Sequence, residues 1–307
     1  MRTLVIGAGA VGGYFAARLV QAGFDVTVAA RGEHGRVLRE RGLLIRSLGS
    51  GDASAQGEEV VPLPRVVDDA STLGQRFDLI LLGVKALQLE GACDALPNLV
   101  TPNGVVAPLL NGLTSEDVVA RYVGAQRTIS AVAYMSSGLM EPGALYVHGQ
   151  VRLGLAPYRP GQEDDLARIA AMFEKASVAV QRSEDHRAML WQKMVWNAPL
   201  NAICALAEKP AGVCIERMKP TVARAMREVI AVAAAEGTKL PEKLVDNMLD
   251  MSLKQFPMTE PSMLQDMRRG RATEVDVLQG EVVARAEQLG VDVPVLSTLA
   301  ALVRTRV

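Results

Sequence analysis

The chain begins with a glycine-rich turn between a predicted strand and a predicted helix. The apolar run Thr3 to Ile6 is short and rich in β-branched residues, and it stops at Gly7, which predicts a buried parallel strand. The apolar pattern from about Val11 to Ala22 predicts a helix, with Gly23 just past its end. A second strand is predicted over Val26 to Ala30. This order of elements is that of a βαβ unit.

The glycines of this turn have the spacing of a dinucleotide-binding motif. Gly7 permits a sharp exit from the strand, Gly9 lets the backbone approach a pyrophosphate, and Gly12 lets the helix press against the sheet. The amide groups at the start of that helix then point at an anion. We therefore expect a dinucleotide to bind at Gly7, Gly9, Ala10, Val11 and Gly12. A purely structural turn is the weaker alternative, because a strand and a helix flank the glycines.

The residue after the second predicted strand indicates which cofactor binds. An acidic residue there would bind the ribose 2′-hydroxyl of NAD, whereas an arginine accommodates the 2′-phosphate of NADP. Arg31 follows the strand, and a guanidinium forms two parallel charge-assisted bonds with a phosphate. The pattern favours NADP. Glu33 leaves NAD open as the alternative, since its carboxylate could reach a ribose.

Two further apolar runs end in polar residues. The predicted strand from Asp78 to Val84 ends at Lys85, and the one from Val105 to Leu110 ends at Asn111. Ligands of open parallel sheets bind at the carboxyl ends of the strands. We therefore expect Lys85 and Asn111 to lie near the cofactor. An ordinary solvated loop position is the alternative for Lys85, because polar residues commonly follow strands.

The length and pattern of the chain predict two domains. Its 307 residues exceed one typical domain. From about residue 184 to the end the apolar period is almost wholly helical. We predict an α/β fold, with a Rossmann-type parallel-sheet domain over residues 1–184 and an all-helical domain over residues 185–307. The remaining predicted elements of the first domain are helices over 35–41 and 162–175 and strands over 43–45, 60–63, 129–135, 144–147, 151–155 and 178–181.

Composition bears on partners and location. The formal net charge of -1 and the lack of long Lys/Arg runs give no attraction to nucleic acid or anionic membranes. Cys93, Cys204 and Cys214 show neither disulfide nor zinc spacing and suit a reducing cytoplasm. No apolar run reaches the roughly 18 residues of a spanning helix. We expect a cytoplasmic protein with neither nucleic-acid nor membrane partners, and a homodimer stays open.

One segment of the second domain carries a polar stripe. Lys193, Asn197 and Asn201 are spaced i, i+4, i+8, so they share one face of a helix. The segment is otherwise apolar and contains two tryptophans, which indicates a helix buried on several sides. The pattern therefore favours a polar stripe that faces a cleft over one that faces solvent. Pro199 removes a helical hydrogen bond, and we expect it to kink the helix and shift Asn201.

A second segment of this domain combines capping signals with polar residues. Ser262, with Gln265 three residues later, predicts a capping box. Thr273 is predicted to cap a second helix that runs to about Glu287. Glu274 in the first turn of that helix is favourable to the helix dipole. Capping alone would account for Ser262, so the spacing leaves the roles of these residues open.

Together these motifs resemble the ketopantoate reductase family, the 2-dehydropantoate 2-reductases of pantothenate synthesis. The resemblance extends over nearly the whole chain in the same order. It implies an N-terminal Rossmann domain, a C-terminal helical domain, an active-site cleft between them, and NADPH as hydride donor to a small 2-keto acid. The motifs are GAGAVGG at 7–13, VAARGEH at 28–34, VKA at 84–86, NG at 111–112, WQK at 191–193 with Asn197 and Asn201, SMLQD at 262–266 and TEVD at 273–276.

The resemblance also implies roles for single residues. Lys193 would be the general acid that protonates the ketone oxygen, and Glu274 would polarise or position the reacting group. Asn197, Asn201 and Ser262 would hold the carboxylate and hydroxyl of the substrate. Asn111 would lie between cofactor and substrate, Lys85 near the cofactor, and Asp266 beside the site as support.

The implied chemistry agrees with these residue types. Hydride arriving at a keto carbon leaves an alkoxide, which needs a proton from a group such as a partly desolvated lysine. No metal is implied. The alternatives that stay open are a reductase of another 2-keto acid, an enzyme that uses NADH, and a non-catalytic nucleotide-binding protein.

Overall fold

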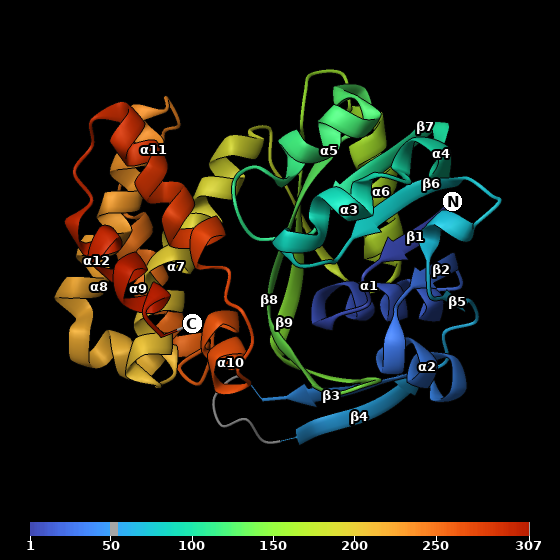
Figure 1. Ribbon diagram of the computed structural model, residues 1–307, viewed down its shortest axis with the longest axis horizontal. Helices are drawn as coiled ribbons and strands as arrows, with labels where there is room; N and C mark the ends of the chain where they lie inside the picture. Colours follow the sequence, from blue (N-terminus) through green and yellow to red (C-terminus); the bar gives the residue numbers. More distant parts are fainter. Residues whose placement is uncertain (50–54, 307) are drawn as a thin grey trace. The chain divides into compact units, whose positions relative to one another are not determined.

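The computed structural model describes residues 1–49 and 55–306, and their contacts divide them into two compact units. Unit 1 comprises residues 1–48, 55–110 and 114–186, and unit 2 comprises residues 49, 111–113 and 187–306. Unit 1 contains both strands and helices, whereas the regular elements among the described residues of unit 2 are helices (Figure 1). The predicted fold class, a Rossmann-type domain followed by a helical one, is confirmed.

A five-stranded parallel sheet organises unit 1, with the strand order β5-β2-β1-β6-β7. Its strands are β1 (Arg2–Ile6), β2 (Asp25–Ala29), β5 (Val66–Val67), β6 (Phe77–Leu82) and β7 (Val100–Pro108). Alternate residues of β1 and β6 enter two separate cores, since Val5 and Leu81 pack in one and Leu4 and Ile80 in the other. Burial on both faces explains why the sequence reads as continuous apolar runs.

Helices cover both faces of this sheet. Phe15 of α1 meets Phe173 of α6 edge to face at 5.5 Å, in the core shared with the second sheet. The helices α3 to α5 cover the opposite face. The helices of unit 1 are α1 (Ala10–Gln21), α2 (Gly32–Arg41), α3 (Leu89–Cys93), α4 (Leu96–Leu99), α5 (Ser115–Val123) and α6 (Glu163–Lys175), with short 3-10 turns η1 (Ala70–Thr72), η2 (Ala86–Gln88) and η3 (Ala125–Arg127).

A second, mixed sheet lies in the same unit, with the order β10-β9-β3-β4 and β8 paired to β9. Its strands are β3 (Leu43–Leu48), β4 (Ala55–Val61), β8 (Ile129–Glu141), β9 (Ala144–Pro157) and β10 (Ala179–Arg182). The prediction of two strands over 144–147 and 151–155 is wrong. The two parts form one strand, β9, because antiparallel β8 pairs with residues on both sides of the polar middle of β9.

Unit 2 contains α7 (His186–Ala207), α8 (Ala211–Ala235), α9 (Leu244–Gln255), α10 (Ser262–Arg268), the π-helical turn η4 (Asp276–Gly280), α11 (Glu281–Leu289) and α12 (Pro294–Arg304). Helix α7 continues through Pro199, whereas α8 has non-helical torsion angles at Met218, two residues before its own proline. In the described part of the chain, no helix has the length and hydropathy needed to cross a membrane.

Two predicted helix caps are wrong. Pro261 occupies the cap position of α10, and the hydroxyl of Ser262 donates instead to the side chain of Asn201. The Gln265 amide donates to the carbonyl of Glu260, so no capping box forms. The hydroxyl of Thr273 is buried without a hydrogen-bond partner. A partner from α7 therefore replaces local capping at Ser262, which is a contact that local sequence spacing does not reveal.

Candidate functional site

The glycine turn of unit 1 is closely packed at two of its three motif positions. Gly7 has a φ of +92°, and its N–H donates to the carbonyl of Ala29 over 3.0 Å. A Cβ on Gly7 would lie 2.8 Å from the backbone of Gly83, and a Cβ on Gly12 would overlap the Gly7 carbonyl oxygen. These two glycines are thus required by backbone conformation and by helix-to-sheet contact.

Gly9 differs, because neither conformation nor packing explains it. It caps α1 with a φ of -63°, and a Cβ there would come no closer than 3.9 Å to a protein atom. No side chain caps α1, and its first turn carries no acidic residue. A glycine with open space beside uncapped helix N–H groups suits a pyrophosphate that approaches the backbone. The turn residues therefore fit a dinucleotide.

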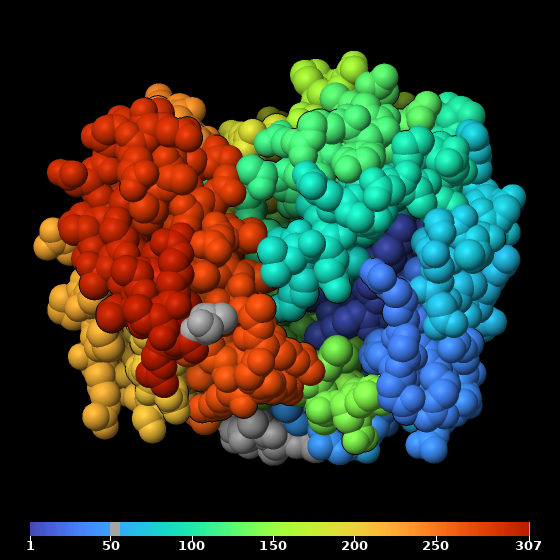
Figure 2. Space-filling model, in the orientation of Figure 1, coloured from blue at the N-terminus to red at the C-terminus, as the bar shows by residue number. Residues whose placement is uncertain are grey.

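Gly83 packs against this turn, although the sequence motifs did not predict it as a site residue. It follows β6, and a Cβ there would lie 2.6 Å from the Gly7 oxygen and 2.9 Å from the Gly12 Cα. The available signal was a glycine directly after an apolar strand, a position where two backbones approach each other. The space-filling view shows the dark-blue N-terminal segment in a hollow of unit 1, between the blue and teal surfaces (Figure 2).

The two predicted basic cofactor residues follow strands of the parallel sheet. Arg31 comes two residues after β2, is exposed, and occupies the cap position of α2. Its charge also acts on Asp69, where a hydrogen bond from Ser71 and then the Arg31 charge hold the carboxyl pKa below its usual value. Lys85 is exposed and comes three residues after β6. Both residues lie at the carboxyl edge of the sheet, and their contacts with a cofactor stay predictions.

Five of the predicted site residues are joined in one chain of hydrogen bonds in unit 2. The Asn197 amide donates to the Asn111 side-chain oxygen over 3.1 Å, and the Asn111 amide donates to Glu274 over 3.4 Å. In the other direction, the Asn201 amide donates to the Asn197 carbonyl over 3.0 Å, and the Ser262 hydroxyl donates to Asn201 over 3.2 Å. We call these five residues the amide cluster.

Lys193 lies one helical turn before Asn197 on α7. Both are half-buried, whereas Met194 and Val195 between them are buried, so the two polar side chains share the accessible face of the helix. The helix continues through Pro199, and the Asn201 amide donates to the Asn197 carbonyl one turn earlier. The shift of Asn201 expected from this proline stays a prediction. The predicted polar stripe of α7 is thus present, with the Asn201 end buried and the Lys193 end accessible.

Asn201 is the buried member of the amide cluster, with an exposed fraction of 2%. Its side-chain oxygen accepts from both the Ser262 hydroxyl and the Met263 N–H, the latter over 3.1 Å. An amide oxygen has two lone pairs, so this acceptor is fully used. Asp266 is likewise buried within α10. Asn201 therefore joins α7 to the start of α10, and Asn197 and Ser262 are the more accessible cluster members.

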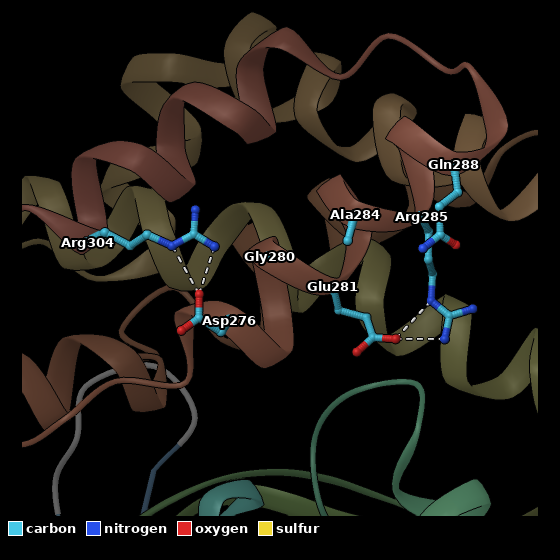
Figure 3. A pocket seen from close by; sticks show the side chains of 7 residues that line it. All are labelled: Asp276, Gly280, Glu281, Ala284, Arg285, Gln288 and Arg304. Carbon is cyan, nitrogen blue, oxygen red and sulfur yellow. Dashed lines mark hydrogen bonds and ion pairs between the residues drawn. The ribbon is translucent and has the colours of Figure 1, made fainter.

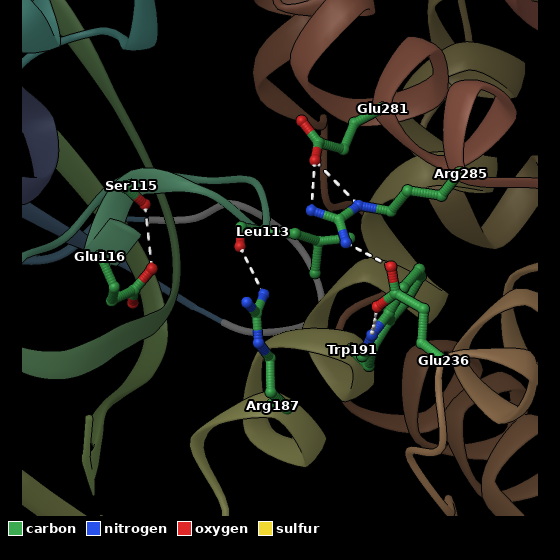
Figure 4. A network of polar contacts seen from close by, with 8 residues as sticks. All are labelled: Leu113, Ser115, Glu116, Arg187, Trp191, Glu236, Glu281 and Arg285. Carbon is green, nitrogen blue, oxygen red and sulfur yellow. Dashed lines mark hydrogen bonds and ion pairs between the residues drawn. The ribbon is translucent and has the colours of Figure 1, made fainter. Parts of the chain in front are cut away.

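A charged network fixes the start of α7 (Figure 4). Arg285 of α11 pairs with Glu236 and, over 2.6 Å, with Glu281, and the Trp191 indole N–H donates to Glu236 over 3.2 Å. Arg187 donates to the carbonyl of Leu113 over 3.0 Å. These contacts hold the Lys193 turn of α7 against its neighbours and fix the 111–113 segment that carries Asn111.

A separate pocket of about 460 Å³ lies beside η4 and α11 (Figure 3). Its charged groups pair with each other, because Arg304 binds Asp276 over 2.7 Å and Arg285 binds Glu281. No residue of the amide cluster lines it. The paired charges argue against this pocket as the place where a keto acid reacts.

Comparison with known proteins agrees with the geometry of the turn and the cluster. A family model described as ketopantoate reductase PanE/ApbA matches residues 3–160, and its C-terminal counterpart matches residues 185–307. The chain belongs to the ketopantoate reductase family. The predicted family and the predicted oxidoreductase class are therefore confirmed.

Family members and related structures cover the whole chain. The 2-dehydropantoate 2-reductase of Streptococcus pyogenes serotype M18 is 29% identical over 311 residues, which cover 100% of this chain and 98% of that protein. The crystal structure of 2-dehydropantoate 2-reductase from Geobacter metallireducens GS-15 has a TM-score of 0.90 at 29% identity, with 100% of both chains covered. A ternary structure of D-mandelate dehydrogenase with NADH and anilino(oxo)acetate has a TM-score of 0.91 at 25% identity, covering 100% of this chain and 98% of that one.

Proposed function

We propose that this protein reduces 2-dehydropantoate to pantoate with NADPH, in the synthesis of pantothenate. The observation that carries the proposal is the amide cluster with Lys193 one turn away on the accessible face of α7. A keto acid offers a carboxylate and a ketone oxygen, and amide, hydroxyl and ammonium groups are the donors that bind such oxygens. Family membership and relatives named 2-dehydropantoate 2-reductase support the choice of substrate.

The glycine turn and Arg31 are the proposed cofactor residues. The first-turn N–H groups of α1 bind the pyrophosphate beside Gly9, where no side chain intervenes. Arg31 binds the 2′-phosphate, and Lys85 contributes a second positive charge at the same sheet edge. Bound at this turn, a nicotinamide dinucleotide supplies the hydride for the keto carbon.

Lys193 is the proposed proton donor. Reduction of the ketone places negative charge on its oxygen, and a lysine Nζ that holds a proton at that oxygen stabilises the charge and then transfers the proton. Glu274 is held by the Asn111 amide, and its proposed role is to orient the reacting group.

Asn197 and Ser262 are the proposed contacts to the substrate carboxylate and hydroxyl. Each is half-buried, so each can exchange its present hydrogen bond for one to a ligand. Asn201 acts differently. Because its oxygen already accepts two hydrogen bonds and its side chain is buried, we assign it the positioning of Asn197 and Ser262 rather than a substrate contact of its own.

A second candidate is the reduction of an aryl 2-keto acid with NADH, which the similarity to D-mandelate dehydrogenase favours. The two functions differ in the side chain next to the keto group and in the 2′-substituent of the cofactor. The test is a panel of 2-keto acids, with 2-dehydropantoate and phenylglyoxylate as extremes, each assayed with NADPH and with NADH. The proposal requires the highest kcat/KM for 2-dehydropantoate with NADPH, and a preference for phenylglyoxylate with NADH would replace it by the second candidate.

A further inference from the structure

We propose that His34 is a positioning residue that holds the glycine turn in the conformation that binds the dinucleotide. The inference rests on the proposed function of that turn. His34 belongs to α2 and reaches back to the turn, where its Nε2 lies 2.7 Å from the carbonyl oxygen of Ala8. Its other ring nitrogen, Nδ1, accepts the N–H of Gly143 over 3.0 Å. All three residues lie in unit 1.

These two contacts define the state of the ring. A backbone N–H can only donate, so Nδ1 must be the acceptor and carries no proton. The imidazole is therefore neutral with its proton on Nε2, and Nε2 donates to Ala8. Both ring nitrogens are used, one on each side of the residue. His34 thus connects the glycine turn to the hairpin that joins β8 and β9.

The hairpin end of this connection is closely packed. Gly143 has a φ of +79°, and its missing Cβ leaves the space that Val37 of α2 occupies. Its carbonyl accepts the N–H of Leu44 in β3 over 2.9 Å. The ribbon shows α2 next to the ends of β8 and β9 (Figure 1). The Gly143 N–H that His34 accepts therefore belongs to a hairpin held by contacts with α2 and β3.

The turn end of the connection lies at the peptide between Ala8 and Gly9. In a trans peptide the carbonyl and the following N–H point in opposite directions, and the described residues contain no cis peptide. A carbonyl of Ala8 held toward His34 therefore aims the Gly9 N–H to the other side. Gly13 of α1 contributes to the same geometry, because a Cβ there would come 3.0 Å from the Ala8 oxygen. His34 thereby orients one of the N–H groups proposed to bind the pyrophosphate.

This role differs from that of Arg31. The pyrophosphate is common to NADPH and NADH, so loss of His34 weakens both cofactors equally, whereas loss of Arg31 weakens NADPH selectively. The residues proposed to bind the keto acid and to donate the proton belong to unit 2, whereas His34 belongs to unit 1. We therefore expect a change in cofactor affinity, with the KM for the keto acid at saturating cofactor unchanged.

The experiment uses three variants that separate the two contacts. In H34Q the side-chain amide can still donate to Ala8, in H34N the side-chain oxygen can still accept from Gly143, and H34A can do neither. Dissociation constants for NADPH and NADH come from fluorescence titration of the purified full chain, which requires no turnover. His148, a half-buried histidine of β9, supplies the control variant H148A. Thermal unfolding of every variant shows whether it is folded at the titration temperature.

The proposal predicts that H34A and H34N bind both cofactors about tenfold more weakly, the effect of losing one orienting hydrogen bond of roughly 1.4 kcal/mol. H34Q and H148A stay within about threefold of the wild type. Wild-type affinity in folded H34A, or equal losses in H34Q and H34N, would overturn the role of His34 and leave the proposed reductase function intact. A wild-type chain that binds neither cofactor would instead overturn the role of His34 and the proposed function together. If H34A does not fold, the comparison of H34Q with H34N still decides, because only H34Q keeps the donor to Ala8.

Discussion

The side-chain amide of Asn197 donates a 3.1 Å hydrogen bond to the side chain of Asn111, although 86 residues separate them in the chain. Asn111 follows the last strand of the parallel sheet, and Asn197 lies on the helix that carries Lys193. Asn111 also donates to Glu274, so this single side chain connects three segments that carry predicted site residues. The relationship gives the amide cluster a defined geometry.

Replacing Lys193 by alanine should lower turnover by about a hundred- to ten-thousandfold, because a positioned general acid contributes on that order. NADPH affinity should change little. The variant K193R is the matched control, since arginine keeps the positive charge and does not release its proton at ordinary pH. Steady-state kinetics of both variants measure the effect. If K193R retains most of the turnover, charge alone suffices and the proton comes from another group.

Replacing Asn201 by alanine should lower stability and raise the KM for the keto acid together. The substitution leaves the buried Met263 N–H and the half-buried Ser262 hydroxyl without their common acceptor, at a cost of roughly 1 to 3 kcal/mol. Urea unfolding and keto-acid kinetics give the two readouts. Asn197→Ala is the comparison, because this half-buried side chain should affect KM with little loss of stability. An N201A protein as stable as the wild type would argue against the positioning role.

Replacing Arg31 by alanine should weaken NADPH by about tenfold or more and leave NADH nearly unchanged. The lost contact is a charge-assisted bond to the 2′-phosphate, worth roughly 1.5 to 3 kcal/mol. Titration of both cofactors against the variant and the wild type measures the ratio of their affinities. The assignment of NADP specificity to Arg31 fails if the two cofactors lose affinity to the same extent.

Glu116 should make unit 1 less stable as the pH rises from about 4.5 to about 6. Burial raises the pKa of this carboxyl to about 6, while hydrogen bonds from Ser130 (2.8 Å) and Ser115 (3.3 Å, Figure 4) partly oppose the shift. Between its unfolded value of 4.5 and about 6 the folded state therefore holds the proton that the unfolded state has lost. Stability is highest below this window and falls across it by roughly 2 kcal/mol.

The variant E116Q tests this pH dependence, because a neutral amide keeps the shape of the side chain and has no proton to lose in this range. Denaturant unfolding at several pH values gives the free energy of unfolding. Between pH 4.5 and 6 this free energy should fall less steeply with pH for E116Q than for the wild type. An exposed glutamate provides the control, and Glu242→Gln should leave the slope as it is. Identical slopes for E116Q and the wild type would contradict the account of Glu116.

Much of unit 1 was predictable because its signals are local. The run Asp78 to Leu82 is apolar since both faces of the parallel sheet are buried. Gly7 has a positive φ, and Gly12 meets the Gly7 carbonyl five residues earlier. The second sheet was only partly predictable. The polar middle of β9 resembles a loop in the sequence, and pairing with β8 makes it a strand.

The candidate site was predictable as a set of residues and less so as a geometry. Helical spacing places Lys193 and Asn197 on one face, and the structure agrees. The same spacing gives Asn201 the same status as Asn197, yet Asn201 is buried by α10, which arrives from 61 residues away. Ser262 carried a capping signal that this distant contact overrides. His34 ends one of the family motifs, yet the sequence assigned it no role, because its two partners come from the turn and from a hairpin far along the chain.

The measurement that tests the central claim most directly is the absorbance decay of NADPH after 2-dehydropantoate is added to the purified protein, with the product identified in the same reaction. The account predicts that NADPH is consumed in equal amount to the pantoate formed, and that the K193A protein, prepared alongside, loses this activity while still binding NADPH. A wild-type protein that binds NADPH and leaves it unoxidised in the presence of 2-dehydropantoate would contradict the account.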